Sequence, residues 1–235
     1  MRIWDDCDKI ISVIFGRNLF VCRLWHKYCL PVNKFTGERI KKMETERLVL
    51  REMTSDDFGA LYEVLADSDI MKHYPYTFDE KRVRNRINKN IERYRIPGFG
   101  LWAVCLKDTG EMIGDCGLTM QNIDGFIMPE IGYHIAKKHQ HKGYAKEAAG
   151  KCRDWAFLNT PFGAVYSYMH KDNIASSATA RANGMRLVKE FTDTDGAETS
   201  VYGITREEWD KKWGVRNNAD NMRKTELHYS ALKPY

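Results

Sequence analysis

The chain has 235 residues, 43% hydrophobic and 29% charged, a composition typical of a globular protein with one well-buried domain. The net charge is +5, but residues 1–42 hold nine Lys and Arg against four Asp and Glu, which leaves 28 residues of each sign elsewhere. A balanced main body argues against a dedicated nucleic-acid binder, which carries a basic footprint on its folded domain. We therefore expect no DNA partner.

The first 42 residues show neither a membrane span nor a secretion signal. The apolar stretch Ile10–Trp25 is interrupted by Arg17 and Arg23 and is too short to cross a bilayer as a helix. Acidic residues near the start, such as Asp5, also argue against a signal peptide. The six cysteines include no C-x-x-C pair, so we expect reduced thiols, a cytoplasmic location and no membrane partner.

Regular structure is predicted to begin with a strand over RLVLRE, residues 47–52. Thr54 or Ser55 then caps a helix. One face of that helix carries a stripe of apolar side chains at helical spacing: Phe58, Leu61, Tyr62 and Leu65. Such a stripe must pack on a sheet.

A second helix is predicted from about Asp79 to Tyr94, because apolar residues recur there at helical spacing. Its other face is basic and carries Lys81, Arg82, Arg84, Arg86, Lys89 and Arg93. The simplest interpretation is a solvated helix face. The functional alternative is an electrostatic guide for an acidic substrate or for ribosomal RNA.

Three strands are predicted next, at Leu101–Leu106, Met112–Thr119 and Met128–Ile135, with Pro97-Gly98 ending the helix before them. The turns between these strands are short and contain Asp, Asn and Gly. Short links join antiparallel neighbours, so an antiparallel meander follows.

The third of these strands leads into Gln140-x-x-Gly143-x-Ala145 and then a helix. Small residues there allow main-chain N–H groups to point outward at the start of the helix, an arrangement that binds phosphate without a metal. The helix is predicted to bury small and aromatic side chains, namely Ala145, Ala148, Ala149, Cys152, Trp155 and Ala156. Its outer face is predicted to hold Lys146, Glu147, Lys151 and Arg153.

The last elements are a strand at Ala164–Met169, a short helix at Ser176–Asn183, and two closing strands at Leu187–Phe191 and Ser200–Ile204. Residues 213–235 form a polar, unpatterned tail. The order predicts an α/β fold, a mixed sheet with helices on its faces.

With these features in order, the chain resembles the GNAT superfamily of acyl-CoA-dependent N-acyltransferases, and within it the ribosomal-protein N-terminal (RimJ/RimL-like) branch. The motifs that carry the resemblance are METERLVLRE from Met43, EIGYHI, Gln140-x-x-Gly143-Tyr144-Ala145 with Glu147, Asn173-x-x-Ser176 and YGITREEW. The likeness covers about residues 43–212 and implies a mostly antiparallel central sheet flanked by helices. Residues 1–42 lie outside it. Because Met43 begins a sequence that looks like the start of the family, we expect that the start codon was assigned upstream of the native one. The alternative is an amphipathic docking helix at Ile10–Trp25.

The resemblance implies acetyl-CoA as cosubstrate and no metal. It places the diphosphate on main-chain N–H groups of the Gln140–Ala145 turn, and Asn173 on the pantetheine arm. The cofactor-binding residues that it implies are His134, Ile135, Gln140, Lys142, Gly143, Tyr144, Ala145 and Asn173. Packing glycines in a tight turn are the alternative reading. His139 and His141 flank the turn as expected exposed loop histidines.

Transfer needs a neutral amine. An α-amine of pKa near 8 is roughly 10% neutral at pH 7, whereas a lysine is about 0.04% neutral. Glu130 matches a position where relatives carry a general base. Its alternative is a strand-edge carboxylate paired with a neighbouring Arg or Lys.

Ser176 matches a position that can donate a proton to the leaving sulfur, and its alternative is a helix N-cap. Many relatives use a Tyr in this helix, and none lies between Ser176 and Gly184. The end of the helix, Ala182 to Met185, also departs from the Lys-Leu-Gly-Phe of relatives. An acyl-carrying Cys105 or Cys116 is a weaker idea, because cysteines in apolar strands are usually inert.

The sequence thus predicts an N-acetyltransferase that acts on a protein or peptide α-amine, with a ribosomal protein as one acceptor class. Two alternatives stay open at this stage. One is a small-molecule acceptor such as a polyamine or antibiotic. The other is a catalytically silent acyl-CoA-binding module, for which the missing Tyr and the altered helix end argue.

Overall fold

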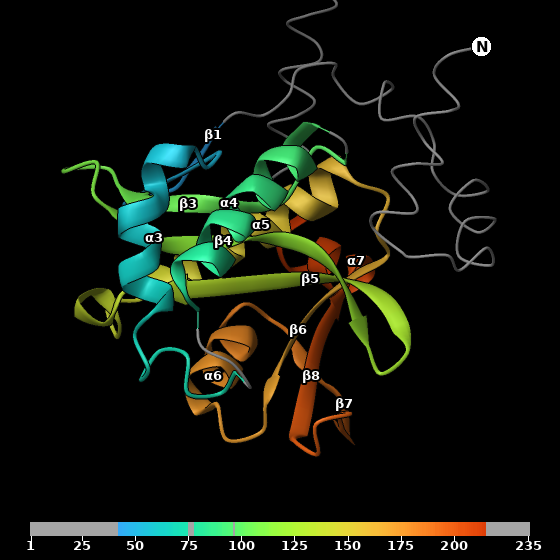
Figure 1. The fold of residues 1–235 in the computed structure, drawn as a ribbon. Coiled ribbons are helices and arrows are strands. Elements are labelled where there is room, and N and C mark those ends of the chain that lie inside the picture. Colours follow the sequence, from blue (N-terminus) through green and yellow to red (C-terminus); the bar gives the residue numbers. More distant parts are fainter. Residues whose placement is uncertain (1–41, 75–77, 96, 215–235) are drawn as a thin grey trace, which may run out of the picture.

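The computed structural model describes residues 42–74, 78–95 and 97–214. Eight strands form one sheet in the order β1-β2-β3-β4-β5-β6-β8-β7 (Figure 1). The strands are β1 (Lys42–Glu44), β2 (Leu48–Arg51), β3 (Leu101–Leu106), β4 (Met112–Ile123), β5 (Phe126–Ile135), β6 (Ala164–His170), β7 (Arg186–Thr192) and β8 (Glu198–Thr205). The helices are η2 (Ser55–Asp57), α3 (Phe58–Leu65), α4 (Glu80–Arg95), η3 (Lys137–His139), α5 (Tyr144–Asn159), α6 (Ile174–Ala182), α7 (Arg206–Trp209) and η4 (Asp210–Gly214).

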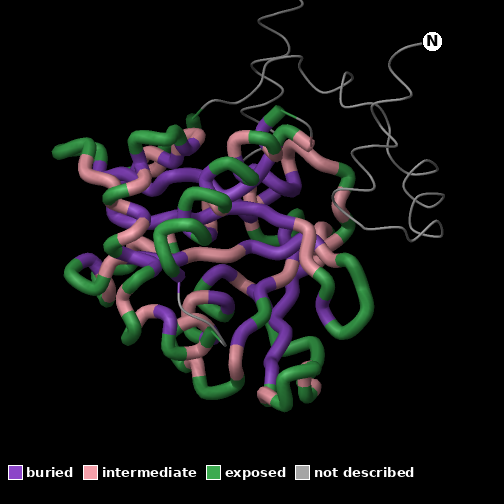
Figure 2. Tube along the Cα trace, viewed as in Figure 1, coloured by how far each residue is buried: buried purple, intermediate pink, exposed green. Residues whose placement is uncertain are grey.

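Helices cover both faces of the sheet, α3 and α4 on one face and α5 on the other (Figure 1). Two adjacent residues of β4 show this division. The Arg86 side chain of α4 reaches Asp115, whereas Cys152 of α5 lies 3.6 Å, sulfur to sulfur, from Cys116. Because successive strand residues point to opposite faces, α4 and α5 sandwich β4. The buried residues follow the central strands, and the loops at their ends are exposed (Figure 2).

The sheet has two halves with little strand pairing between them. Strands β1 to β5 form a continuous antiparallel meander. Strands β6, β8 and β7 form a second antiparallel group. The halves are joined by a single parallel pairing, Glu130 with Tyr166, after which β5 and β6 diverge (Figure 1). Beyond that pairing the β5 main chain has no strand partner on its β6 side among the described residues, and we call this interruption of the sheet the opening.

The α/β prediction is confirmed, with the mostly antiparallel sheet that the resemblance implied. Strand β3 has the predicted bounds, and α4 begins one residue after Asp79, whose carboxylate caps it by accepting from the Arg82 N–H. Sequence reasoning missed β1, which has only three residues, and α7, whose capping box pairs Thr205 with Glu208.

Two local predictions were wrong. Arg153 is buried at 4% exposure instead of lying on the outer face of α5, because its guanidinium donates to the Asn183 carbonyl and lies 3.8 Å from the Trp213 ring. Helix α6 begins at Ile174 instead of Ser176, because Asn173 caps it by accepting from the Ser176 N–H. Ser176 is therefore inside the first turn and is not the cap.

Some expectations fall outside the described residues, namely those for residues 1–41, including the docking helix, and for the tail from residue 215. Within the described part of the chain, none of the helices has the length and apolar character needed to cross a bilayer.

Candidate active site

The diverging strands leave main-chain groups of β5 open toward β6. The Ala136 N–H donates to the Ile113 carbonyl at 2.8 Å, so even-numbered residues of this segment direct their main-chain groups toward β4. The N–H groups of Tyr133 and Ile135 then face the opening, beyond the one pairing between β5 and β6 that the described residues contain. Two donors in a row are thus available to a ligand in the gap.

The segment after β5 is built as a tight corner. The side-chain amide of Gln140 donates to the Ile135 carbonyl at 2.9 Å, which folds the loop back on the strand. His141 and Gly143 both have positive φ, 60° and 82°. Gly143 is the N-cap residue of α5 in the left-handed conformation, which glycine adopts without a steric penalty. The first N–H groups of α5 lack partners within the helix, as at every helix start, and suit an anion.

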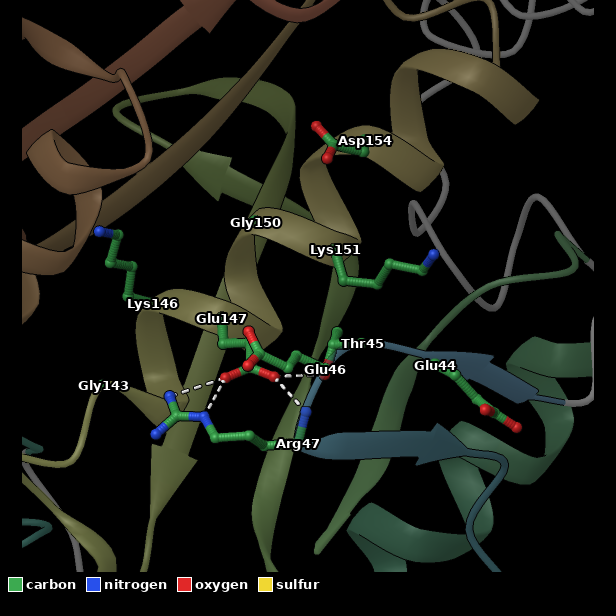
Figure 3. Close-up of a pocket in the computed structure, with 10 residues that line it drawn as sticks. All are labelled: Glu44, Thr45, Glu46, Arg47, Gly143, Lys146, Glu147, Gly150, Lys151 and Asp154. Atoms are coloured by element: carbon green, nitrogen blue, oxygen red, sulfur yellow. Dashed lines mark hydrogen bonds and ion pairs between the residues drawn. The ribbon is translucent and has the colours of Figure 1, made fainter. Parts of the chain in front are cut away.

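Arg47 clamps this corner from the β1–β2 hairpin (Figure 3). Its guanidinium donates to the Lys142 carbonyl at 3.0 Å, pairs with Glu147 at 2.7 Å and stacks 4.6 Å from the Tyr144 ring. The Glu147 carboxylate also accepts from the Thr45 hydroxyl and the Arg47 N–H. Burial raises the pKa of Glu147, but these hydrogen bonds and the Arg47 charge lower it below its usual value. Glu147 is the acidic side chain in the first turn of α5. Its negative charge is therefore balanced by Arg47, and its carboxylate is hydrogen-bonded to the hairpin.

A shallow surface groove of about 600 Å³ runs between this hairpin and α5. Its lining includes Gly143, Lys146 and Gly150 but no residue of β5 or β6 (Figure 3). The groove therefore borders the corner from outside and is separate from the opening between the strands.

On the α4 face, β5 presents Glu130, Gly132 and His134 in alternation. Glu130 is 9% exposed and accepts from the Thr119 hydroxyl at 3.0 Å. Burial raises its pKa to about 7, although the Thr119 hydrogen bond and the nearby Arg86 offset part of the effect. Gly132 is partly exposed between Glu130 and His134, and the Glu130 carboxylate leans over it, with one oxygen 3.0 Å from the position that a Cβ on Gly132 would take.

Asp115, and not Glu130, holds the Arg86 guanidinium. The Asp115 carboxylate is fully buried and takes both the Arg86 guanidinium at 3.0 Å and the His134 Nδ1 at 2.7 Å. Burial raises the pKa of Asp115, but the Arg86 charge and the His134 contacts outweigh it and bring the pKa to about 2. The alternative for Glu130 was a strand-edge carboxylate paired with a neighbouring Arg or Lys. Among the described residues its carboxylate is buried, makes no ion pair within 4 Å and accepts from Thr119 instead.

The α6 side of the opening contains Ser176 and Asn173. The Asn173 side chain is used to cap the helix, and the Tyr133 hydroxyl of β5 donates to the Ser176 carbonyl at 2.9 Å. The Tyr133 side chain therefore extends from β5 to α6. Its phenol lies beside this helix, which itself has no Tyr between Ser176 and Gly184.

The structure gathers most of the predicted residues around one opening but separates His134 from the rest. Ile135, Gln140, Lys142, Gly143, Tyr144 and Ala145 line the end of β5 and the corner, and Ser176 and Asn173 lie across from them. His134, expected at the cofactor, is paired through its main chain with β4, and its ring lies on the α4 face. The structure thus places its ring on the α4 face, away from the opening and from the corner at Gly143.

Other expectations are also corrected. His139 is buried at 9% exposure instead of being an exposed loop residue, because its ring packs inward near Tyr144, whereas His141 is exposed as predicted. Cys105 and Cys116 are buried thiols whose pKa is raised by burial, which argues against nucleophilic roles. Cys105, Cys116 and Cys152 are free thiols. Across the described ranges, no group of three or more His, Cys, Asp or Glu is arranged to hold a metal ion.

Sequence reasoning missed the side chains that meet Glu130 and His134 from elsewhere: Tyr74, Arg86, Asp115 and Thr119. Arg86 was identified only as part of a basic helix face. The alternation along β4 and β5 was a usable signal, because it places Asp115 and His134 on one face once their strands are paired in register. Tyr74 gave no signal, since it lies between two helices.

Comparison with known proteins identifies the family of the domain. The acetyltransferase (GNAT) domain matches residues 47–186. The uncharacterized protein YkkB of Bacillus subtilis is 36% identical over 63% of this chain and 87% of its own length. A GNAT-family acetyltransferase from Bacillus anthracis superposes with a TM-score of 0.63 at 26% identity, covering 71% of this chain and 99% of that one.

The fold is also shared with RimL, a ribosomal L7/L12 α-N-protein acetyltransferase solved with coenzyme A. The TM-score is 0.58 at 18% identity, over 68% of this chain and 95% of that one. At this identity the likeness shows the fold alone. The matched domain covers more than half of the sequence, and the chain therefore belongs to the GNAT family of acetyltransferases.

Proposed function

We propose that the protein transfers an acetyl group from acetyl-CoA to the α-amine of a protein or peptide N-terminus. The observation that carries this proposal is Glu130, a buried carboxylate with a pKa of about 7 beside the open edge of β5. A general base is most effective when its pKa lies near the working pH. An α-amine, with a pKa near 8, differs from Glu130 by about one unit, whereas a lysine differs by more than three.

The residues of the opening fit acetyl-CoA. The N–H groups of Tyr133 and Ile135 suit the pantetheine amides and the thioester carbonyl, and the corner from Gln140 to Ala145 suits the diphosphate. Glu147 is neutralised by Arg47, so it does not repel phosphate at the start of α5. We keep Lys142, Tyr144 and Asn173 in this set and place Tyr133 where His134 was expected.

Glu130 then takes the proton that the amine gives up. The neutral nitrogen forms a bond to the carbonyl carbon, its proton passes to the Glu130 carboxylate, and the carbon–sulfur bond breaks. The sulfur leaves as the thiolate of coenzyme A, whose conjugate acid has a pKa near 8.5 and needs only modest protonation. Ser176, at the α6 side, is the hydroxyl that we assign to stabilise it, because the Tyr133 hydroxyl hydrogen is already donated to the Ser176 carbonyl.

The narrower proposal, a ribosomal-protein acceptor, rests on the resemblance of the motifs to that branch and on the shared fold with RimL. A small-molecule amine is the second candidate, because a primary amine of any origin has the same reacting atoms. The two are separated by their preference for an α-amine over other amines.

The test is a thiol-release assay with acetyl-CoA and four acceptors: a peptide with a free α-amine and no lysine, the same peptide with a blocked N-terminus and one lysine, spermidine, and an aminoglycoside. Intact mass identifies each acetylated product. We expect the α-amine peptide to be preferred over the lysine peptide by at least tenfold in kcat/KM. Preference for spermidine or the aminoglycoside would replace the proposal by the small-molecule alternative. No thiol release with any acceptor would contradict it.

A further inference from the structure

Two arginines of α4 lie on one face of the helix, and they differ in what they pair with. Arg86 and Arg93 are seven residues apart, which is about two turns. Arg86 pairs with the Asp115 carboxylate at 3.0 Å. The Arg93 guanidinium is partly buried, and among the described residues it makes one long hydrogen bond, from Nη1 to the Asn90 Oδ1 at 3.5 Å, and no ion pair. A guanidinium has five N–H donors, so most of its binding capacity is unused.

The contacts of α4 with the sheet show the direction in which the helix runs. Arg86 reaches Asp115 of β4, and one turn later the Asn90 Oδ1 accepts from the Leu101 N–H at 2.9 Å. Leu101 is paired with Gly117, two residues beyond Asp115. Helix α4 therefore follows β4 in the same chain direction.

The next turn of α4 brings Arg93 level with Glu130. Thr119 comes two residues after Gly117 and is paired with Glu130 in the register of β4 and β5. Burial raises the pKa of Glu130, and the charges of Arg86 and Arg93 oppose this. Burial lowers the pKa of Arg93, and the charge of Glu130 opposes that. The arginine and the base are therefore neighbours on the α4 face.

The unpaired state of Arg93 indicates what kind of group it can bind. A partly buried guanidinium has lost part of its hydration, and without a carboxylate it has gained no ion pair in exchange. Its planar fork matches the two oxygens of a carboxylate, to which it donates charge-assisted hydrogen bonds. Gly132, next to Glu130 on this face, is partly exposed, so solvent reaches this part of β5. A ligand whose amine lies at Glu130 and whose carboxylate lies a few ångströms away would satisfy both groups.

We propose that Arg93 binds a carboxylate of the acceptor and makes the enzyme selective for peptides that carry an acidic side chain close to the N-terminus. This inference rests on the proposed function. In an extended peptide with its α-amine at Glu130, the second and third residues lie about 3–7 Å further along the chain, within reach of a long arginine side chain. The acidic-substrate guide that the basic face of α4 suggested is then one residue of the helix and not its whole surface.

The experiment uses two amidated peptides of the same composition. One has glutamate at the second position and glutamine at the sixth, and the other has these two residues exchanged. Both have the same net charge, so long-range attraction to the protein is equal, whereas a glutamate at the sixth position lies about 16 Å from the amine in an extended chain. Assays at about pH 8.5, above the pKa of Glu130, keep ionisation of the base from limiting either reaction.

We expect the wild-type protein to favour glutamate at the second position by about tenfold in kcat/KM, mostly through KM, which is the effect of one partly exposed hydrogen bond between charged groups. Arg93→Gln should reduce this preference to within about twofold of none, and Arg93→Lys should restore part of it. Because Arg93 has no carboxylate partner among the described residues, Arg93→Gln should keep the wild-type thermal midpoint and KM for acetyl-CoA.

The matched control is Lys89→Gln, which removes an exposed cation from the same helix and should leave the preference at the wild-type value. An equal loss of preference in Lys89→Gln and Arg93→Gln would replace the contact at Arg93 by the general field of the helix. Equal slowing of both peptides by Arg93→Gln, with the preference unchanged, would assign Arg93 a structural role and overturn the inference.

The remaining outcomes separate this inference from the function on which it rests. A wild-type protein that acetylates the two peptides equally well would overturn the role of Arg93 and leave α-amine transfer intact. A wild-type protein that acetylates neither peptide would overturn the proposed function and this inference together.

Discussion

The two sides of β5 differ in what they use for binding. Toward β6 and the corner at Gly143, the site consists of main-chain N–H groups and a glycine at positive φ. On the α4 face it consists of buried side chains, Glu130 and His134, held by partners from other elements. In our proposal, the main-chain donors bind the diphosphate and amides that any acyl-CoA carries. Side chains in a low-dielectric setting set proton affinity and acceptor choice.

This contrast predicts that substitutions on the α4 face change proton transfer and stability, whereas substitutions at the corner change the KM for acetyl-CoA. Four changes test the contrast.

The largest effect is expected for Glu130→Gln, which removes the base. We expect kcat/KM for an α-amine peptide to fall by about 10²–10⁴-fold with little change in the affinity for acetyl-CoA. In the pH profile, the limb near pH 7 should disappear and leave that of the amine near 8. Steady-state kinetics from pH 5.5 to 9 measure both. Glu92→Gln, an exposed residue of α4, is the control, and a retained limb at pH 7 would assign the base elsewhere.

The same variant should also change how the free energy of unfolding depends on pH. The folded protein binds a proton at Glu130 up to a pKa of about 7, whereas the unfolded chain releases it near 4.5. Wild-type stability therefore falls as pH rises from 4.5 to 7, by up to about 3 kcal/mol. Urea unfolding should show a smaller fall in Glu130→Gln over this range. An equal fall in both proteins would mean that Glu130 is not the titrating group.

Asp115→Ala comes next. It leaves Arg86 and His134 without their shared partner, and breaking a buried pair costs about 3 kcal/mol of unfolding free energy at pH 7. The folded pKa of about 2 lies below the ordinary 3.8, so the contribution of Asp115 is complete above pH 3.8 and is lost as pH falls toward 2. The deficit measured by urea should therefore narrow in acid. The control is Asp172→Ala, at an exposed position, which should change the free energy of unfolding by less than about 0.5 kcal/mol. A loss as large as that of Asp115→Ala would show that the buried ion pairs of Asp115 are not the cause of its effect.

Gly143→Val should raise the KM for acetyl-CoA about tenfold or more, since a side chain at φ 82° costs about 1–2 kcal/mol and distorts the start of α5. Gly125→Val imposes similar strain at φ 83° in the β4–β5 turn and serves as the matched control. Its KM should stay at the wild-type value. Equal KM values in the two variants would show that the corner does not hold the cofactor.

The smallest effect is expected for Arg47→Ala, which releases Glu147 and the Lys142 carbonyl. The pair is partly exposed, so we expect a rise of about two- to fivefold in the KM for acetyl-CoA, stronger at low salt, with kcat unchanged. Arg186→Ala breaks a comparable exposed pair with Glu208 far from the corner and should leave the KM unchanged. A fall in kcat with a constant KM would show that Arg47 acts in the chemical step and not in binding acetyl-CoA.

Local pattern alone was enough for much of the fold. The bounds of β3, the apolar stripe of α4 and the turn before α5 follow from periodicity and from Gly143, because these features depend on neighbours in sequence. Element ends that depend on caps were less accurate. Asn173, and not Ser176, is the N-cap residue of α6, because its side chain accepts a hydrogen bond from the Ser176 N–H.

Sequence by itself determined the corner at Gly143 and the presence of Glu130 on an alternating strand, since both are encoded within a few residues. Tertiary structure decided the rest of the site. It set which strand partner leaves the Tyr133 and Ile135 N–H groups open, that Asp115 rather than Glu130 takes Arg86, and that Tyr74 meets His134. These outcomes depend on desolvation and on contacts between residues 29 to 60 positions apart, which no local pattern contains.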